Sequence, residues 1–262
     1  MHGRRDLHPR SRRSVDKLVI GKSAPASTVL DGYDIRDRPQ IYARLAGAIY
    51  LAVIVMGGLA EGLVMNALVV PGDDAATVDA ILRHQALWNW GLAANLIVPL
   101  IAVVQLWIEY MLLRPAGRGL ALLFVLLNLA SLSVEAVSKL FQLMVLPLAR
   151  DGADGGQALA SMALLGHGLA FNIALIFFGA ACLVIGALIW RSTYLPRFVG
   201  VLMQVAGVCY LVSCLSELLV PSFARMINPA ILLPVLVGES AFCLWLLVMG
   251  VKRSEWQVQV GR

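Results

Sequence analysis

Six long apolar runs, separated by short polar segments, dominate the chain from residue 41 onward. Each run reaches the ~20 residues that a helix needs to cross ~30 Å of hydrocarbon. Because lipid offers the backbone no hydrogen-bond partner, a spanning segment of this kind must be helical. The pattern therefore predicts an all-α, polytopic membrane protein, a bundle of six transmembrane helices. The predicted spans are approximately residues 41–70, 86–113, 119–148, 158–190, 198–220 and 230–251.

The segments that connect the runs alternate in charge. Basic residues precede the first run, separate the second from the third and the fourth from the fifth, and follow the sixth. They are Arg36, Arg38, Arg44, Arg114, Arg118, Arg191, Arg197, Lys252 and Arg253. The other connections are acidic or nearly neutral. Because short basic loops stay in the cytoplasm, we predict that both termini are cytoplasmic and that the membrane is the inner membrane of a bacterial cell.

The chain divides into three parts. Residues 1–40 are rich in Arg, Ser, Pro and Asp and contain too little apolar surface to offset the entropy of an ordered chain. They are predicted to be a disordered, basic cytoplasmic tail. Residues 41–251 are the six-helix transmembrane domain, and residues 252–262 are a short cytoplasmic tail. Between the first two spans, residues 79–84 are typical of a short amphipathic helix on the outer surface.

Composition agrees with this class of protein and excludes others. Hydrophobic residues make up 60% of the chain and charged residues 14%, and the mean hydropathy is +0.80. A soluble domain of this length needs more charge to cover its surface. The formal net charge of +5 lies in the orienting segments, and no basic patch with interleaved aromatic residues indicates a nucleic-acid partner. The predicted partners are the lipid bilayer and a small molecule or ion, and the oligomeric state is left open.

No sequence motif assigns a reaction, a cofactor or a metal. The chain contains no HExxH, GxSxG, GxGxxG or Walker pattern. Its four cysteines lie inside apolar runs and none has a CxxC spacing, so they are predicted to be small buried residues. They are Cys182, Cys209, Cys214 and Cys243.

The second half of the chain contains several glycine-rich and aromatic motifs. They are Gly166-His167-Gly168, Phe177-Phe178-Gly179, the sequence RSTYLPRFVGVL over residues 191–202, and Gly238-Glu239. With Ala43-Arg44-Leu45-Ala46-Gly47 at the start of the first run, these motifs resemble the bacterial family catalogued as domain of unknown function 4386. The resemblance covers about residues 40–251. It implies a compact six-span membrane domain and brings no reaction or cofactor with it.

Ionisable and amide side chains occur inside the apolar runs, where a charged group costs ~2.5–3.5 kcal/mol on insertion scales and therefore needs a reason. We predict a ligand-binding site composed of Glu61, Asn95, Glu135, Lys139, His167, Glu217 and Glu239. Glu109 lies near the cytoplasmic end of the second span, and we interpret it as interfacial.

The third span carries the clearest polar pattern. Polar residues recur on it at steps of three and four and form one stripe on an otherwise apolar helix: Asn128, Ser131, Glu135, Ser138, Lys139 and Gln142. Glu135 precedes Lys139 by four residues, which is the favourable order for a helical ion pair. Two interpretations stay open. The pair neutralises itself so that the helix inserts, or the stripe forms one wall of a polar cavity.

The depth of these residues follows from counting ~1.5 Å per residue from the charged ends of the spans. The count places Asn95, His167 and Glu239 near mid-membrane, and places Glu61, Glu135, Lys139 and Glu217 in the outer half. The spacing also suggests three helical hairpins, each with a carboxylate in its outgoing arm and a polar group in its returning arm. Chance alignment explains this weak repeat equally well. If it is real, six polar groups converge on one site.

Three functions fit these observations. The first is the binding or transport of a small molecule or ion at an intramembrane polar site. The second is a non-catalytic scaffold or regulator whose polar groups only set helix register. The third is an intramembrane enzyme that uses His167 as a general base and Glu239 as an acid or orienting group. The observation that separates them is which side chains surround His167 and Glu239.

Overall fold

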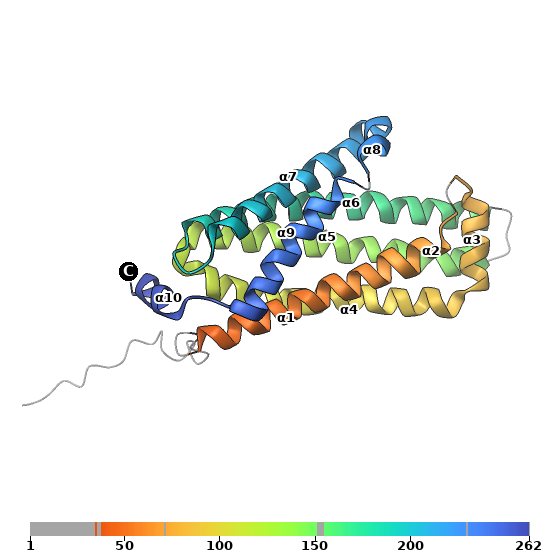
Figure 1. The fold of residues 1–262 in the computed structure, drawn as a ribbon. Coiled ribbons are helices and arrows are strands. Elements are labelled where there is room, and N and C mark those ends of the chain that lie inside the picture. The colour runs from red at the N-terminus through yellow and green to blue at the C-terminus, as the bar shows by residue number, and fades with distance from the viewer. Residues whose placement is uncertain (1–34, 36–37, 71, 151–154, 229, 262) are drawn as a thin grey trace, which may run out of the picture. The chain divides into compact units, whose positions relative to one another are not determined.

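The computed structural model describes residues 35, 38–70, 72–150, 155–228 and 230–261. All regular structure within these residues is helical, and six segments are long and apolar enough to cross a membrane (Figure 1). These segments match the predicted runs to within a few residues, so the prediction of an all-α, six-span bundle is confirmed. They are Pro39–Leu68, Gln85–Ala116, Arg118–Arg150, Gly156–Arg191, Arg197–Leu219 and Leu232–Met249.

Three of the six spans change their winding along their length. The first consists of α1 (Pro39–Gly57), the π-helix η2 (Gly58–Met65) and α2 (Asn66–Leu68). The second is α4 (Gln85–Leu113), which ends in the 3₁₀ turn η3 (Arg114–Ala116). The last is α9 (Leu232–Leu244), which continues as the π-helix η4 (Trp245–Met249). The remaining spans are α5 (Arg118–Arg150), α6 (Gly156–Arg191) and α7 (Arg197–Leu219).

Three shorter helices lie outside the spans: α3 (Asp74–Arg83), α8 (Pro221–Ile227) and α10 (Arg253–Val260). The Asp73 side chain caps α3 by accepting a hydrogen bond from the Ala76 N–H at 2.8 Å, as an N-cap aspartate does. Val78 and Ile81 are fully buried, whereas Asp79 is exposed. The amphipathic helix predicted between the first two spans is therefore present.

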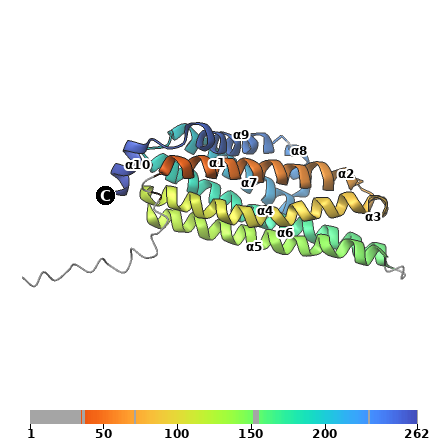
Figure 2. The same ribbon diagram turned by 90° about the horizontal axis from the view of Figure 1, so that it is seen from below.

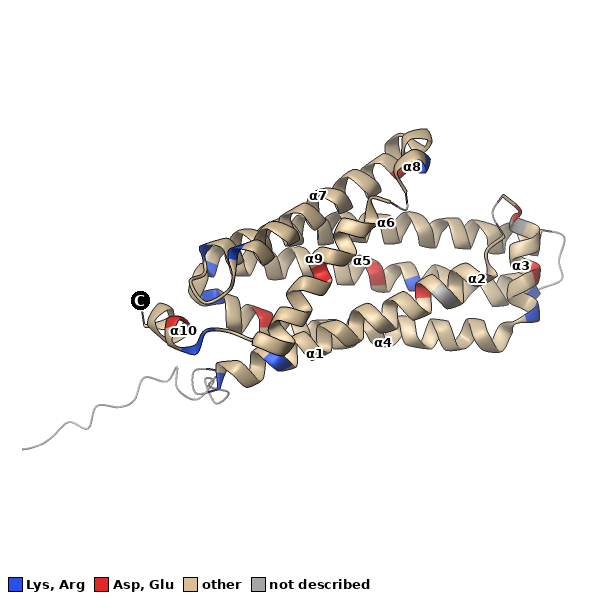
Figure 3. Ribbon diagram, in the orientation of Figure 1, with Lys and Arg blue, Asp and Glu red and all other residues tan. Residues whose placement is uncertain are grey.

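The spans run side by side between two ends of the bundle (Figures 1 and 2). At one end, α1, α5 and α7 begin, α4 and α6 end, and α10 lies close by. We call this the basic end because basic residues lie on the helix ends and connections there (Figure 3): Arg44, Arg114, Arg118, Arg191, Arg197, Lys252 and Arg253. The helix α3 lies at the opposite end, which we call the α3 end.

Glycines bring the backbones of neighbouring spans into direct contact toward the basic end. A Cβ atom on Gly186 of α6 would lie 2.6 Å from the carbonyl oxygen of Gly200 on α7, and a Cβ on Gly200 would lie 2.8 Å from the Gly186 oxygen. Gly179 and Gly207 form a second reciprocal pair between these helices. Gly47 of α1 meets the backbone of η4 in the same way. No side chain fits at these positions, which is how small residues allow close packing in membranes.

One backbone carbonyl ties three segments together at the basic end. The carbonyl oxygen of Leu112, near the end of α4, accepts a hydrogen bond from the Tyr194 hydroxyl at 2.8 Å and another from the Trp256 indole at 3.1 Å. Both aromatic side chains are 1% exposed. Tyr194 lies in the connection between α6 and α7, and Trp256 lies on α10. The segment predicted as a short tail, residues 252–262, therefore contains a helix that packs against the bundle.

The prediction for the N-terminal segment is largely untested. Of residues 1–40, the structure describes residue 35 and residues 38–40, and α1 begins at Pro39. The predicted disorder of that tail lies outside the described residues and stays a prediction.

Candidate functional site

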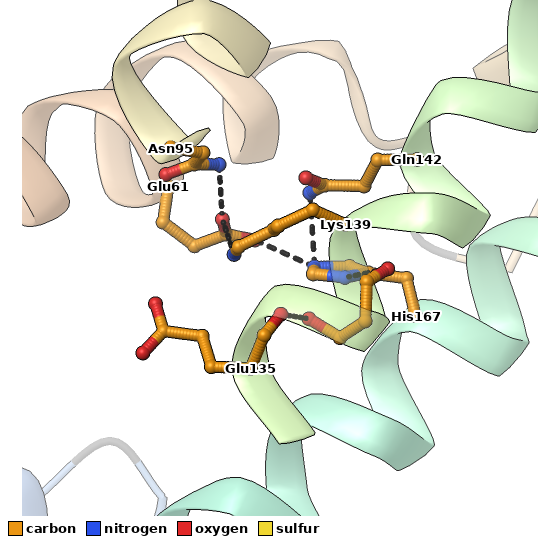
Figure 4. Close-up of polar contacts among 7 residues, drawn as sticks. Glu61, Asn95, Glu135, Lys139, Gln142 and His167 are labelled. Atoms are coloured by element: carbon orange, nitrogen blue, oxygen red, sulfur yellow. Dashed lines mark hydrogen bonds and ion pairs between the residues drawn. The ribbon is translucent and has the colours of Figure 1, made fainter. Parts of the chain in front are cut away.

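Five polar side chains from four spans meet inside the bundle, and we call them the polar cluster: Glu61, Asn95, Lys139, Gln142 and His167 (Figure 4). They come from η2, α4, α5, α5 and α6 respectively. Four of them belong to the predicted site, and Gln142 belongs to the predicted polar stripe. The convergence explains how these residues are tolerated in hydrocarbon, because each one faces a polar partner and not lipid.

Glu61 is the centre of the polar cluster. One of its carboxylate oxygens, Oε2, accepts a hydrogen bond from Asn95 Nδ2 at 2.7 Å and lies 3.4 Å from Lys139 Nζ. The other oxygen, Oε1, lies 3.1 Å from His167 Nε2. The side chain of Glu61 is 25% exposed, whereas that of Lys139 is only 1% exposed. The π-helical winding of η2 carries this carboxylate, and π-helical turns occur frequently at functional sites.

Lys139 does not form the helical ion pair with Glu135 that was one of the two interpretations of the polar stripe. Its ammonium group bonds Glu61, and it lies 4.7 Å from the centre of the Phe171 ring, which provides a cation–π contact. The Glu135 carboxylate turns away from the cluster (Figure 4). The physical reason is burial: a fully buried ammonium needs a partner that is itself held in place, and Glu61 is held by Asn95. The i, i+4 rule describes exposed helix surfaces and does not decide between partners on different helices.

His167 lies between three hydrogen-bonding groups. Its Nδ1 lies 3.2 Å from the backbone oxygen of Ser138, so Nδ1 donates. Its Nε2 lies 2.9 Å from Gln142 Nε2 and 3.1 Å from Glu61 Oε1. A neutral ring accepts from the Gln142 amide, and a protonated ring donates to the Glu61 carboxylate. His167 therefore has a partner for Nε2 in both protonation states.

Two further carboxylates form separate pairs with neutral groups. The Tyr210 hydroxyl donates to Glu239 Oε1 at 2.5 Å, and Gln105 Nε2 donates to Glu109 Oε1 at 2.9 Å. His167 and Glu239 do not contact each other, so the acid–base pair considered from the sequence is not formed. Glu109 is 3% exposed and faces the interior of the bundle, four residues before the end of α4; its interfacial depth stays a prediction.

The depth count failed because the spans differ in length and tilt. The fourth span has 36 residues and the sixth has 18, so equal counts from their charged ends do not give equal depths. In the structure, Asn95 and His167 lie at the level of Glu61 and Lys139, which they contact or neighbour (Figure 4). Glu239 lies on α9, which is tilted against the other spans (Figure 1), and it bonds Tyr210 of α7.

A cavity of about 520 Å³ lies among the spans and borders these groups. Its walls are largely apolar and include Val53, Leu106 and Val235 from three different helices. The polar residues that line it are Tyr50, Glu61, Asn66, Gln105, Glu109, Asn128, Ser131, Glu135, Tyr210 and Glu239. Within the polar cluster, only Glu61 lines the cavity. Its partners, Asn95, Lys139 and His167, lie behind it and hold it, so they support the wall.

Four carboxylates line this cavity, and they differ in their partners. Glu61 has a cationic partner in Lys139. Glu109 and Glu239 each accept a hydrogen bond from an uncharged group. The carboxylate of Glu135, which is partly buried, forms no hydrogen bond or ion pair with a described residue. A carboxylate ion buried without a cationic partner is costly. Glu109, Glu135 and Glu239 therefore either carry a proton or face a cation.

Glu217 does not join the other predicted site residues. It is exposed near the end of α7, and it borders a separate depression with Arg225 and Asn228 of the α8 region. The proposed convergence of six polar groups is therefore incomplete. The reason is local: α7 ends two residues later, at Leu219, so Glu217 lies at the end of its span and not within the bundle.

Sequence reasoning missed several residues that shape the site. Gln105, Tyr50 and Tyr210 line the cavity as neutral side chains in apolar runs, and Phe171 stacks on His167 with ring centres 5.8 Å apart. One signal was available for Gln105, because it lies four residues before Glu109 and therefore on the same helix face. Nothing local distinguishes the two tyrosines from interfacial anchors.

Comparisons with known proteins agree with the fold and assign no activity. Residues 45–250 match the model of a family whose description is "Domain of unknown function (DUF4386)". An uncharacterised protein of Archaeoglobus fulgidus is 27% identical over 148 residues, which are 56% of this chain and 75% of that protein. No solved structure matches the chain.

Proposed function

The chain belongs to the family described as domain of unknown function 4386, and we propose, from the geometry of its cavity, that it binds a small molecule inside the membrane. The molecule occupies the space between the spans, with its polar group among the carboxylates and its apolar body against the walls. In this proposal the basic end faces the cytoplasm, because basic segments are retained there. Both α1 and α10 then begin on the cytoplasmic side of an inner membrane.

The observation that supports binding is the cavity itself. Its volume of about 520 Å³ falls within the range of about 300–1,000 Å³ that is usual for small-molecule sites. Apolar walls with a few polar groups are also the usual composition of such sites. Protein interiors are otherwise close-packed, with few voids larger than a water molecule. A space of this size therefore indicates an occupant.

The two alternatives account for less of the site. For an enzyme, Ser131 is the one serine among the described residues that line the cavity, but it donates to the Ala174 carbonyl at 2.8 Å and bonds no base among those residues. A scaffold needs only the polar cluster, in which Glu61 and Lys139 neutralise each other. It gives no reason for the unpaired carboxylate of Glu135 or for the cavity beside it.

Photolabelling of the purified protein in zwitterionic nanodiscs tests the proposal. The probe is 4-[3-(trifluoromethyl)diazirin-3-yl]benzyl alcohol, which is small, apolar and uncharged. We expect saturable adducts on cavity-lining residues, identified by peptide mass spectrometry. The variant Gly57→Phe fills the cavity, because Gly57 lines it and a Cβ there meets nothing within 4 Å. These adducts should then disappear.

The matched control is Gly168→Phe. A Cβ on Gly168 also meets nothing within 4 Å, but this glycine does not line the cavity. The control should keep the saturable adducts of the wild type. Labelling that never saturates, or that is the same in Gly57→Phe and the wild type, would remove the proposal and favour a scaffold.

Transport is a second candidate, and the two partners of His167 Nε2 favour it. Protonation of the ring moves its bond from Gln142 to Glu61, whose carboxylate borders the cavity. Binding of a ligand in the cavity and binding of a proton by His167 are then linked, as proton-coupled transport requires. In proteoliposomes with an imposed pH gradient, the poorly permeant trimethylammonium form of the probe should collapse the gradient. An equal collapse with His167→Gln would exclude this coupling.

A further inference from the structure

We propose that the cavity is selective for an amphipathic ammonium ion, a protonated amine on an apolar body, whose charged group binds at Glu135. This inference rests on the proposed function and names the chemical class of its ligand. It comes from the charge, the hydrogen-bonding groups, the walls and the opening of the cavity, taken in turn.

The first argument is charge. Among the residues that the structure describes, four glutamates line the cavity, whereas no lysine, arginine or histidine does. Lys139 is paired with Glu61 at 3.4 Å and lies behind it. Glu135 therefore borders the cavity with no cation bonded to it. A ligand cation removes the cost of holding a carboxylate ion there, while an anionic ligand adds to it.

The second argument is hydrogen bonding, because several donors that line the cavity are already bonded to the protein, whereas the Glu135 carboxylate accepts no hydrogen bond from a described residue. Four lining side chains donate to protein acceptors: Gln105, Asn128, Ser131 and Tyr210. In contrast, the side-chain oxygen of Gln105 is buried and has no hydrogen-bond partner, and Gln105 is only 8% exposed. A buried acceptor left in this state costs about 1–3 kcal/mol. An ammonium group supplies N–H donors to the Glu135 carboxylate, which receives none from a described residue.

The third argument is the walls, which favour an organic cation over a metal ion. Among the described residues, no group of three or more His, Cys, Asp or Glu side chains is arranged to hold a metal. Aromatic rings border the cavity instead, including Tyr50, Phe171 and Phe178. Their faces attract ammonium groups, as the contact of Lys139 with Phe171 demonstrates within this site.

The fourth argument is access, which favours an amphipathic ligand over a strongly hydrated one. Gly57, Gly58 and Gly62 border the cavity on the first span, and no atom lies within 4 Å of where their Cβ atoms would be. On α9, the bordering side chains Leu232 and Leu236 are 42% and 54% exposed. The cavity therefore opens between glycines and leucines on the surface that faces hydrocarbon.

Three photoprobes that share one aryl diazirine and differ in charge test this inference. They are the benzylamine, which is a cation at neutral pH, the benzyl alcohol and the benzoate. In zwitterionic nanodiscs, which concentrate neither ion, we expect the cation to label cavity residues at a half-saturating concentration at least tenfold below that of the alcohol. The benzoate should label them more weakly than the alcohol.

The variant Glu135→Gln should abolish the preference for the cation and leave labelling by the alcohol unchanged. Glu217→Gln is the matched control, because it removes an exposed glutamate outside the cavity, and it should keep the preference. Equal labelling by cation and alcohol, or a preference that survives in Glu135→Gln, overturns the inference but not the proposed function. Absence of cavity labelling by all three probes overturns the proposed function. If Glu135→Gln does not fold, the order of the half-saturating concentrations of the three probes on the wild-type protein decides whether the inference holds.

Discussion

The pairing of Glu61 with Lys139 makes a quantitative prediction about stability. In Glu61→Gln, the ammonium of Lys139 stays buried, at 1% exposure, without a carboxylate. Removing one partner of a buried ion pair costs about 3–5 kcal/mol.

The reverse substitution should cost less. In Lys139→Met, the Glu61 carboxylate keeps its hydrogen bond from Asn95 at 2.7 Å, its contact with His167 at 3.1 Å and its 25% exposure. We expect about 1–2 kcal/mol, close to the loss of one charge-assisted hydrogen bond. The double variant contains neither charge and should be no more than about 2 kcal/mol less stable than the wild type. The coupling between the two positions is then at least about 2 kcal/mol.

Reversible unfolding in mixed micelles of increasing SDS fraction, followed by circular dichroism, gives the three free energies. The cysteines Cys182, Cys214 and Cys243 are buried and free, so a thiol-reactive coumarin that fluoresces on reaction reports unfolding independently. If Glu61→Gln is within 0.5 kcal/mol of the wild type, or if the two substitutions are additive, the ion pair does not hold the polar cluster together. The same measurements on Glu217→Gln should show no loss, since that side chain is exposed.

Two further predictions concern packing and the basic end. Gly186→Ala should lower the unfolding temperature, because its Cβ would lie 2.6 Å from the Gly200 carbonyl oxygen. Gly57→Ala should leave the unfolding temperature unchanged, or raise the free energy of unfolding by about 0.5–1 kcal/mol. Equal effects of the two substitutions would contradict the packing argument. Tyr194→Phe should cost about 1 kcal/mol, since the Leu112 carbonyl keeps its bond from the indole of α10. Burial raises the pKa of Tyr194 above its ordinary value of about 10. Its contribution is therefore present below pH 10 and lost above it, so denaturant titrations between pH 9 and 11 should show a smaller loss of stability for Tyr194→Phe than for the wild type.

The sequence predicted the six spans because the hydrophobic requirement of a bilayer acts on each segment alone. It also selected Glu61, Asn95, Lys139 and His167, since an ionisable or amide group in hydrocarbon must find a partner. It could not identify the partners. Lys139 has a carboxylate one turn away on its own helix and another on η2, and only the packing of the helices decides between them.

Position across the membrane was the other property that the sequence did not determine. Glu109 lies close to a charged end, yet the face of α4 that carries it points into the bundle. Glu217 lies in an apolar run, yet its helix ends two residues later. A count along the chain measures distance from a charged residue, whereas burial depends on the helix face and on where the helix ends.

The glycines of the bundle differ in whether a larger residue can replace them. Gly179, Gly186 and Gly200 touch the backbone of a neighbouring helix, so a substitution there forces two helices apart. Gly57 and Gly62 border the cavity, and a Cβ atom at either position meets nothing within 4 Å. The shape of the cavity can therefore change at these two positions while the helices keep their arrangement.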